Sequence, residues 1–206
     1  MKSIWIFKNT REMIISIILF IAFISGFIYI GTKDYTSNKV IDNQKFNKEH
    51  KEVKDNDNIF VYIDSSSALD YVKKDNVIVL FGIKNSDWVG YYANVVNEVA
   101  KEVGISEIYY YDITEDRKDK NAIYEIIVQY LENYITYLDD QTANIYAPAL
   151  LIKKNGLIKY FNDDTALIKG KITSSDYWNE YNTDLMKERL KIELVSYLEE
   201  NIDGEE

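Results

Sequence analysis

Residues 146–156 read Tyr146-Ala147-Pro148-Ala149-Leu150-Leu151-Ile152-Lys153-Lys154-Asn155-Gly156 and contain the single proline of a 206-residue chain. Proline is tolerated at the first residue of a strand but hardly anywhere else in a sheet. A cis peptide bond costs only about 0.5 to 1 kcal/mol before proline, against roughly 2.5 to 4 kcal/mol elsewhere. The pair Asn155-Gly156 is typical of the tight turn of a hairpin. We therefore predict a cis bond before Pro148 and a hairpin of two strands, 149–153 and 157–161.

Strands and helices alternate along the chain before this stretch. Short apolar runs predict strands, and apolar residues spaced three and four apart predict amphipathic helices. The predicted strands are 59–63, 77–81 and 105–113, and the predicted helices are 65–74, 88–103, 120–138 and, after the hairpin, 182–202. Strands that alternate with helices favour parallel pairing with right-handed crossovers.

The first 58 residues differ in composition from the rest. Residues 13–31 form a run of 19 residues without a charge, and a helix needs ~20 apolar residues to cross a bilayer. We predict a transmembrane anchor there, after a tail at 1–12. A cleaved signal peptide is the alternative, although its apolar region usually spans only roughly 7 to 15 residues. Residues 32–58 are polar and predict a tether, which leaves 59–206 as one folded domain.

Basic residues flank the predicted anchor on both sides, so they do not decide its orientation. A short N-terminal tail is typical of a signal anchor. We therefore expect a single-pass protein of the cell membrane with an extracytoplasmic C-terminal domain.

Charge and rare residue types exclude several classes of function. The chain carries 24 basic and 34 acidic side chains, a net charge of −10, and such a surface repels nucleic acid. It has no cysteine, which excludes disulfides, thiolate metal sites and thiol catalysis. Its single histidine, His50, lies in the predicted tether, where we expect a solvated side chain. The acid pairs Asp139-Asp140 and Asp163-Asp164 have the chemistry to bind a hard cation such as calcium, but they lack EF-hand spacing. We therefore expect solvated loops and predict no metal or cofactor.

The order of the elements and two stretches of sequence resemble the thioredoxin fold. Residues 77–104, VIVLFGIKNSDWVGYYANVVNEVAKEVG, are similar to its strand, active-site turn and first long helix, and residues 146–156 to its cis-proline loop and hairpin. The resemblance covers about 59–202 and implies a three-layer α/β/α sandwich with a mixed central sheet, here preceded by one transmembrane helix. The anchor and tether also resemble accessory proteins of Gram-positive bacteria with this fold, including bacteriocin transport accessory proteins.

In the thioredoxin family a Cys-x-x-Cys pair stands at the start of that helix, where the helix dipole favours the thiolate. The similar window here reads Ser86-Asp87-Trp88-Val89, and the buried acid of many thioredoxins would fall at Leu80. The resemblance therefore implies a redox-inactive member. A serine nucleophile needs a base, and no histidine is expected nearby, so Ser86 or Asp87 is predicted to cap the helix. Trp88 fits either an exposed contact or the first core residue of its helix.

Aromatic residues gather around this turn, and tyrosine suits interfaces and half-buried strands alike. The resemblance implies that the proline loop and the helix start meet. The candidate binding residues are Ser86, Asp87, Trp88, Val89, Tyr91, Tyr92, Tyr146, Ala147 and Pro148. We expect a non-catalytic domain that binds a protein or peptide partner in the cell envelope, in a bacteriocin or secretion system. The alternative is a sulfur-independent enzyme, for which the sequence offers no evident set of acids or tyrosines.

Overall fold

The computed structural model describes residues 17–21, 39–138 and 142–199. The chain divides into two compact units, residues 1–41 and 42–206. The described residues of the first unit are helical, and most of the predicted anchor and the whole predicted tail lie outside the described residues. Within the ranges described, no helix is both long and apolar enough to cross a membrane.

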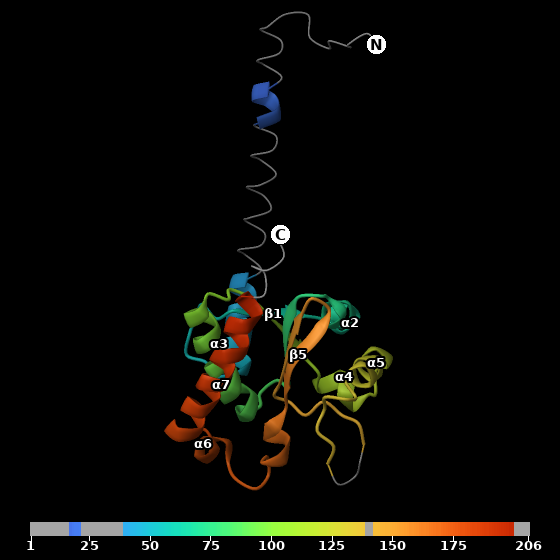
Figure 1. Cartoon of the computed structure of the whole chain (residues 1–206), viewed down its shortest axis with the longest axis vertical. Helices are drawn as coiled ribbons and strands as arrows, with labels where there is room; N and C mark the ends of the chain where they lie inside the picture. The colour runs from blue at the N-terminus through green and yellow to red at the C-terminus, as the bar shows by residue number, and fades with distance from the viewer. Residues whose placement is uncertain (1–16, 22–38, 139–141, 200–206) are drawn as a thin grey trace, which may run out of the picture. The chain divides into compact units, whose positions relative to one another are not determined.

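A mixed sheet runs through the second unit (Figure 1). It has five strands in the order β1-β3-β2-β4-β5. Its strands are β1 (Phe60–Ile63), β2 (Val77–Gly82), β3 (Ile108–Asp112), β4 (Ala149–Lys154) and β5 (Leu157–Asn162). β1 and β2 each pair in parallel with β3, while β4 pairs antiparallel with β2 and β5. β2 and β4 are buried at every position, as expected of central strands covered on both faces.

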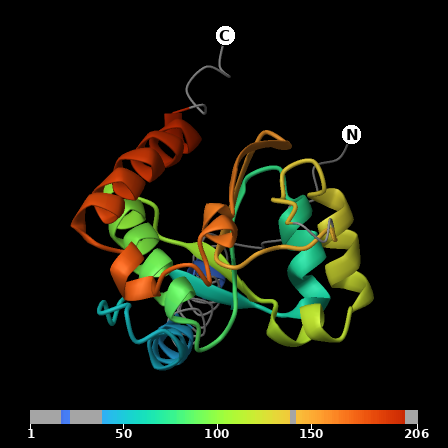
Figure 2. The same cartoon turned by 90° about the horizontal axis from the view of Figure 1, so that it is seen from below.

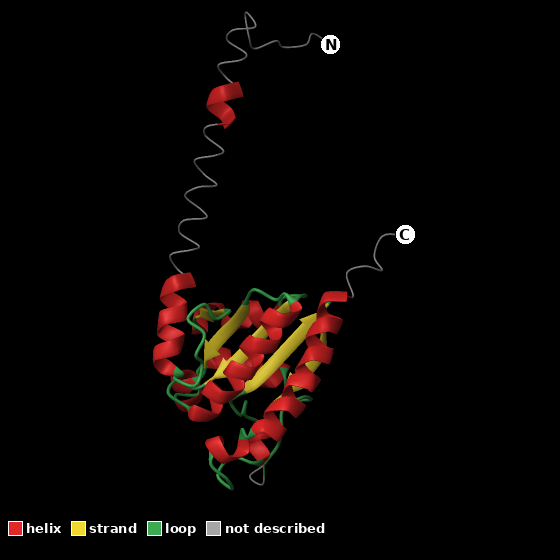
Figure 3. Ribbon diagram, turned by 90° about the vertical axis from the view of Figure 1, so that its left-hand side faces the viewer, coloured by secondary structure: helices red, strands yellow, loops and turns green. Residues whose placement is uncertain are grey.

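Helices cover both faces of this sheet (Figure 3). The helical elements are α2 (Ser65–Lys73), α3 (Asp87–Val103), α4 (Thr114–Lys118), α5 (Ala122–Tyr130), the short 3₁₀ turn η1 (Asp164–Leu167), α6 (Ser174–Tyr177) and α7 (Glu180–Glu199). α3 packs against α7, and α2 packs against α5. These two pairs lie on opposite sides of the sheet (Figure 2). The predicted layered α/β architecture with a mixed sheet is thus confirmed.

Short-range signals in the sequence set the ends of several elements. The Asp64 side chain caps α2, and Gly104 ends α3 in the left-handed conformation, with a φ of 94°. Asn155 and Gly156 both have positive φ angles, as the turn of a two-residue hairpin loop requires. The peptide bond before Pro148 is cis.

The segment between β3 and β4 differs from the expectation. The predicted strand 105–113 is shorter in the structure, and the short helix α4 after it was not predicted. The predicted helix 120–138 ends early because the Leu131 amide bonds to carbonyls three and four residues back, which tightens the last turn. The Thr136 amide and hydroxyl then donate to the buried carboxylate of Asp163, at 2.9 and 2.6 Å. These bonds draw the chain away from the helix axis.

The predicted polar tether, 32–58, is a folded part of the second unit from residue 42 onward. Residues 42–49 are helical, and Phe46 and Val53 are buried in the hydrophobic core. We call residues 42–58 the strap. Residues 32–38 lie outside the described residues.

The polar composition of the strap predicted a solvated tether, but some of its polar side chains are buried in the folded unit. Asn58 is fully buried, and its amide group both accepts from the Phe60 amide and donates to Asn47. His50 is also fully buried, contrary to the expected solvated side chain. A short segment with few apolar residues thus belongs to the folded unit.

Candidate functional site

The predicted binding turn forms the start of α3. Ser86 stands at the N-cap position, but its side chain makes no capping hydrogen bond, while its carbonyl accepts from the Gly90 amide at 3.0 Å. Asp87 is exposed in the first helical turn, where the helix dipole favours a negative charge. The predicted cap is therefore one of position and charge, without a side-chain hydrogen bond from Ser86. Contrary to the expectation that no histidine lies nearby, the Ser86 backbone interacts with His50.

Two aromatic residues of this turn belong to the core. Trp88 is only 8% exposed, and its ring lies 5.4 Å from that of Tyr177. Tyr92 is fully buried beside Trp178, and its hydroxyl donates to the Asn162 side chain at 3.3 Å. The chain around α6 covers both aromatics. The sequence did not decide whether Trp88 is an exposed contact residue or a core residue. The structure places it in the core.

The proline loop lies beside the end of β2, because Phe81 of β2 pairs with Ala149 directly after Pro148. Tyr146 is half-buried, and the Arg117 guanidinium lies 5.3 Å from the centre of its ring. Such an approach of a cation to an aromatic face is attractive.

The predicted site residues therefore separate into two groups. Those in contact with solvent are Ser86, Asp87, Tyr91 and Tyr146, and those that are buried are Trp88, Val89, Tyr92, Ala147 and Pro148. Of the four aromatic residues in this set, Tyr91 and Tyr146 are in contact with solvent and Trp88 and Tyr92 are buried.

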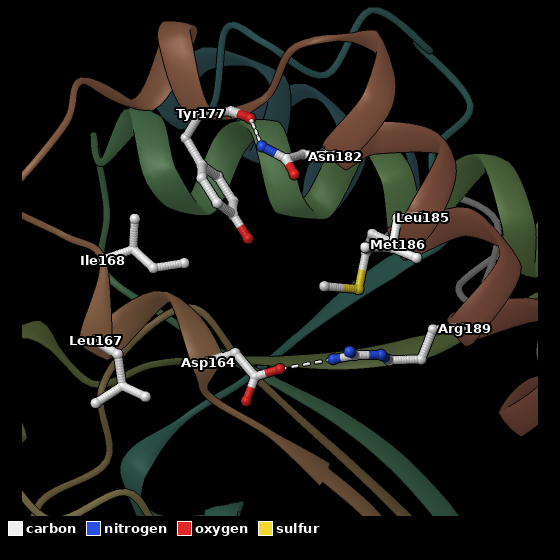
Figure 4. A pocket seen from close by; sticks show the side chains of 8 residues that line it. All are labelled: Asp164, Leu167, Ile168, Tyr177, Asn182, Leu185, Met186 and Arg189. Carbon is white, nitrogen blue, oxygen red and sulfur yellow. Dashed lines mark hydrogen bonds and ion pairs between the residues drawn. The ribbon is translucent and has the colours of Figure 1, made fainter.

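A pocket of about 210 Å³ opens where η1, α6 and α7 meet (Figure 4). Its lining residues are Asp164, Leu167, Ile168, Tyr177, Asn182, Leu185, Met186 and Arg189. The Tyr177 ring and the Met186 thioether point into the space. Tyr177 also packs on Trp88, so the pocket lies next to the start of α3.

Polar groups hold the walls of the pocket in place. Arg189 donates to the Asp164 carboxylate at 2.6 Å, and the Asn182 amide donates to the Tyr177 carbonyl at 2.7 Å. The hydrogen bond to Asp164 raises the pKa of Arg189, and burial raises the pKa of the Tyr177 hydroxyl. At neutral pH the pocket therefore carries one ion pair and an uncharged phenol. Because the two charges of the ion pair offset each other, the pocket suits an apolar occupant.

The apolar surface continues outside the pocket. Leu167 and Leu185 are 52% and 48% exposed, and Tyr181, one helical turn before Leu185, is 76% exposed. Neighbours four residues apart share a face of a helix. The helix is predicted from a different row, in which Met186, Leu190, Leu194, Leu198 and Ile202 recur every four residues. The second apolar row, at 181 and 185, was the signal that could have located this site.

No match to this chain is found among models of known protein families or among curated proteins. The function of the chain is therefore inferred from the chemistry of the site.

Proposed function

We propose that this chain is a membrane-tethered, redox-inactive thioredoxin-like protein whose folded domain binds a protein or peptide partner in the cell envelope, in a bacteriocin or secretion system. The strand order, with a proline-led hairpin after the parallel strands, supports the thioredoxin-like assignment. The uncharged run at 13–31 supports the tether. The absence of cysteine excludes thiol–disulfide exchange by this chain.

The pocket between η1, α6 and α7 is the observation that carries the binding role. Its volume of about 210 Å³ is below the roughly 300 to 1,000 Å³ typical of pockets that enclose drug-sized ligands. A single large side chain of a partner fits this volume better than a whole metabolite. Side chains seated in desolvated pockets commonly anchor protein interfaces.

The surface around the pocket favours a peptide over an isolated side chain. Leu167, Tyr181 and Leu185 extend the apolar contact beyond the pocket mouth. The exposed carboxylates of Glu180 and Asp184 stand on the same helix. We therefore propose a partner segment with one large apolar anchor side chain and basic residues beside it, because complementary charge speeds association and selects partners.

Selection of peptides from a phage-displayed random library against the full chain tests this function. We expect the selected peptides to carry a large apolar residue next to lysine or arginine. Leu185→Asp is expected to weaken their binding at least about tenfold, because burying an unpaired carboxylate costs more than the roughly 1.4 kcal/mol of a tenfold change. Fluorescence anisotropy of labelled peptides measures the affinity.

The matched control is Ile192→Asp, which introduces the same charge on the same helix at a residue that is 69% exposed and outside the pocket. This variant is expected to bind as the parent does. Peptides that bind Leu185→Asp as tightly as the parent, or that lose affinity equally in both variants, would show that the pocket is not the binding site.

A further inference from the structure

The strap is seated on an aromatic cluster of β1 and β3. The Phe46 ring stacks on Phe60 at 4.2 Å and meets the edge of Tyr110 at 4.9 Å, measured between ring centres. Tyr62 adds a third ring, 6.1 Å from Phe46. Aromatic pairs in these geometries contribute about 0.5 to 1.5 kcal/mol beyond their buried area. The cluster therefore holds the helical part of the strap against the sheet.

His50 also packs in this aromatic cluster, as a buried, uncharged ring. Its Nε2 lies 2.9 Å from the Tyr110 hydroxyl, and its ring centre lies 4.6 Å from that of Phe46. Its Nδ1 is buried and has no hydrogen-bond partner among the residues that the structure describes. An imidazolium would carry a proton on both nitrogens, and burial disfavours its positive charge although the Ser86 backbone favours it by a smaller amount. Burial therefore favours the neutral form of the His50 ring.

The charged groups around His50 are engaged elsewhere. Asp112 of β3 accepts from the Thr114 amide and hydroxyl, and Glu49 of the strap accepts from the Tyr62 hydroxyl at 2.6 Å. Burial raises the pKa values of Tyr62 and Tyr110, so both phenols stay neutral. Neither carboxylate forms a direct ion pair with His50 among the described contacts.

Burial lowers the pKa of His50 from 6.5 to about 4, and the Asp112 carboxylate and the nearby Ser86 backbone oppose this shift by smaller amounts. A closed strap therefore binds the proton less readily than an open one. Neutral His50 stabilises the closed strap fully above pH 6.5, and this stabilisation is lost as the pH falls toward 4. Asp42, whose carboxylate accepts from the Tyr62 amide, acts in the opposite sense, because burial raises its pKa.

The strap also covers the start of α3. A Cβ atom added at Gly90 would overlap the Glu52 carboxylate, so the end of the strap lies directly against this helix. Other contacts of the second unit do not involve the strap. These are the pairing of β4 with β2 and β5 and the packing of α3 on α7 and of α2 on α5. Release of the strap leaves those contacts in place, and it breaks the contacts of Phe46 and Val53 with the core and the bonds of Asp55 to Lys101 and Asn97 of α3.

We propose that the strap is an acid-released latch: protonation of His50 detaches residues 42–58 from β1, β3 and α3 while the remainder of the second unit stays folded. Release uncovers the Phe60, Tyr62 and Tyr110 rings and the first turns of α3. The inference concerns a surface separate from the pocket on α7 and does not depend on the binding function proposed above.

Thiol labelling of the full chain tests the latch, because a cysteine-free protein allows single introduced thiols. Val53→Cys reports on the strap and Val128→Cys on α5; the parent valines are 3% and 4% exposed. Lys48→Cys, on the exposed side of the strap, gives the rate of an unprotected thiol. Each variant is labelled with 4,4′-dithiodipyridine at about pH 7 and about pH 4.5, on either side of the expected release.

We expect the protection of the thiol in Val53→Cys, relative to Lys48→Cys, to fall at least about tenfold on acidification, since a pKa difference of about two units shifts an equilibrium by up to about a hundredfold. Val128→Cys should remain protected. His50→Gln, which keeps a hydrogen-bonding side chain but does not titrate in this range, should abolish the change. The latch is refuted if protection in Val53→Cys does not change with pH, if Val128→Cys loses protection in parallel, or if His50→Gln retains the response.

Discussion

Two glycines show how closely side chains approach the backbone around the strap. A Cβ atom at Gly82, the last residue of β2, would overlap the ring of Tyr110. At Gly90, in α3, it would overlap the Glu52 carboxylate. The two neighbours differ in freedom, because the Tyr110 ring is fully buried whereas Glu52 is half-buried and its carboxylate can turn toward solvent. The same substitution should therefore have different costs at the two sites.

We predict that Gly82→Ala lowers the free energy of unfolding by about 1 to 3 kcal/mol, the usual cost of overpacking a core. Gly90→Ala should cost clearly less, because alanine gains about 1 kcal/mol over glycine inside a helix and offsets the displacement of Glu52. Urea unfolding followed by circular dichroism measures both values. Equal losses in the two variants would contradict the packing of Tyr110 on Gly82.

At the scale of elements, the sequence predicted best where a local signal sets the structure. β2 is a continuous apolar run, Gly104 ends α3, and Asn155-Gly156 turns the hairpin, and each of these depends on residues adjacent in the chain. The strap was missed because its composition is polar although Phe46 packs in the core. The burial of Trp88 was left open because Tyr177, which covers it, lies 89 residues later (177 − 88) in a stretch without clear periodicity.

α7 carries apolar residues on its buried side and others that are exposed. Leu190 is fully buried on the side that packs against α3, whereas Ile192, two residues later, is 69% exposed. We predict that Leu190→Ala lowers the free energy of unfolding by about 2 to 5 kcal/mol through the cavity it leaves. Ile192→Ala should change it by no more than about 0.5 kcal/mol. Chemical denaturation of both variants checks the pair, and a reversed order would mean that α7 is rotated about its axis.

At the scale of the whole molecule, the site could not be read from any one segment. The pocket takes its walls from η1, α6 and α7, and its ion pair joins Asp164 to Arg189, 25 residues apart. The segment 163–178 supplies the residues that cover Trp88 and Tyr92. This segment thus buries two of the predicted binding residues, Trp88 and Tyr92, and an open pocket lies beside them.

The boundary of the folded unit gives the last prediction. A tether can be removed without loss of stability, whereas the strap buries Phe46 and Val53 in the core, and each buried side chain of this kind contributes about 1.5 to 3 kcal/mol. We predict that a chain lacking residues 1–41 keeps the stability of the second unit, measured by urea unfolding near neutral pH. A chain lacking 1–58 should lose at least about 3 kcal/mol, because both side chains leave the core. Equal stabilities of the two truncated chains would show that residues 42–58 are a tether and not part of the folded unit. The rings of Phe60 and Tyr110 would then have to be exposed to water without loss of stability.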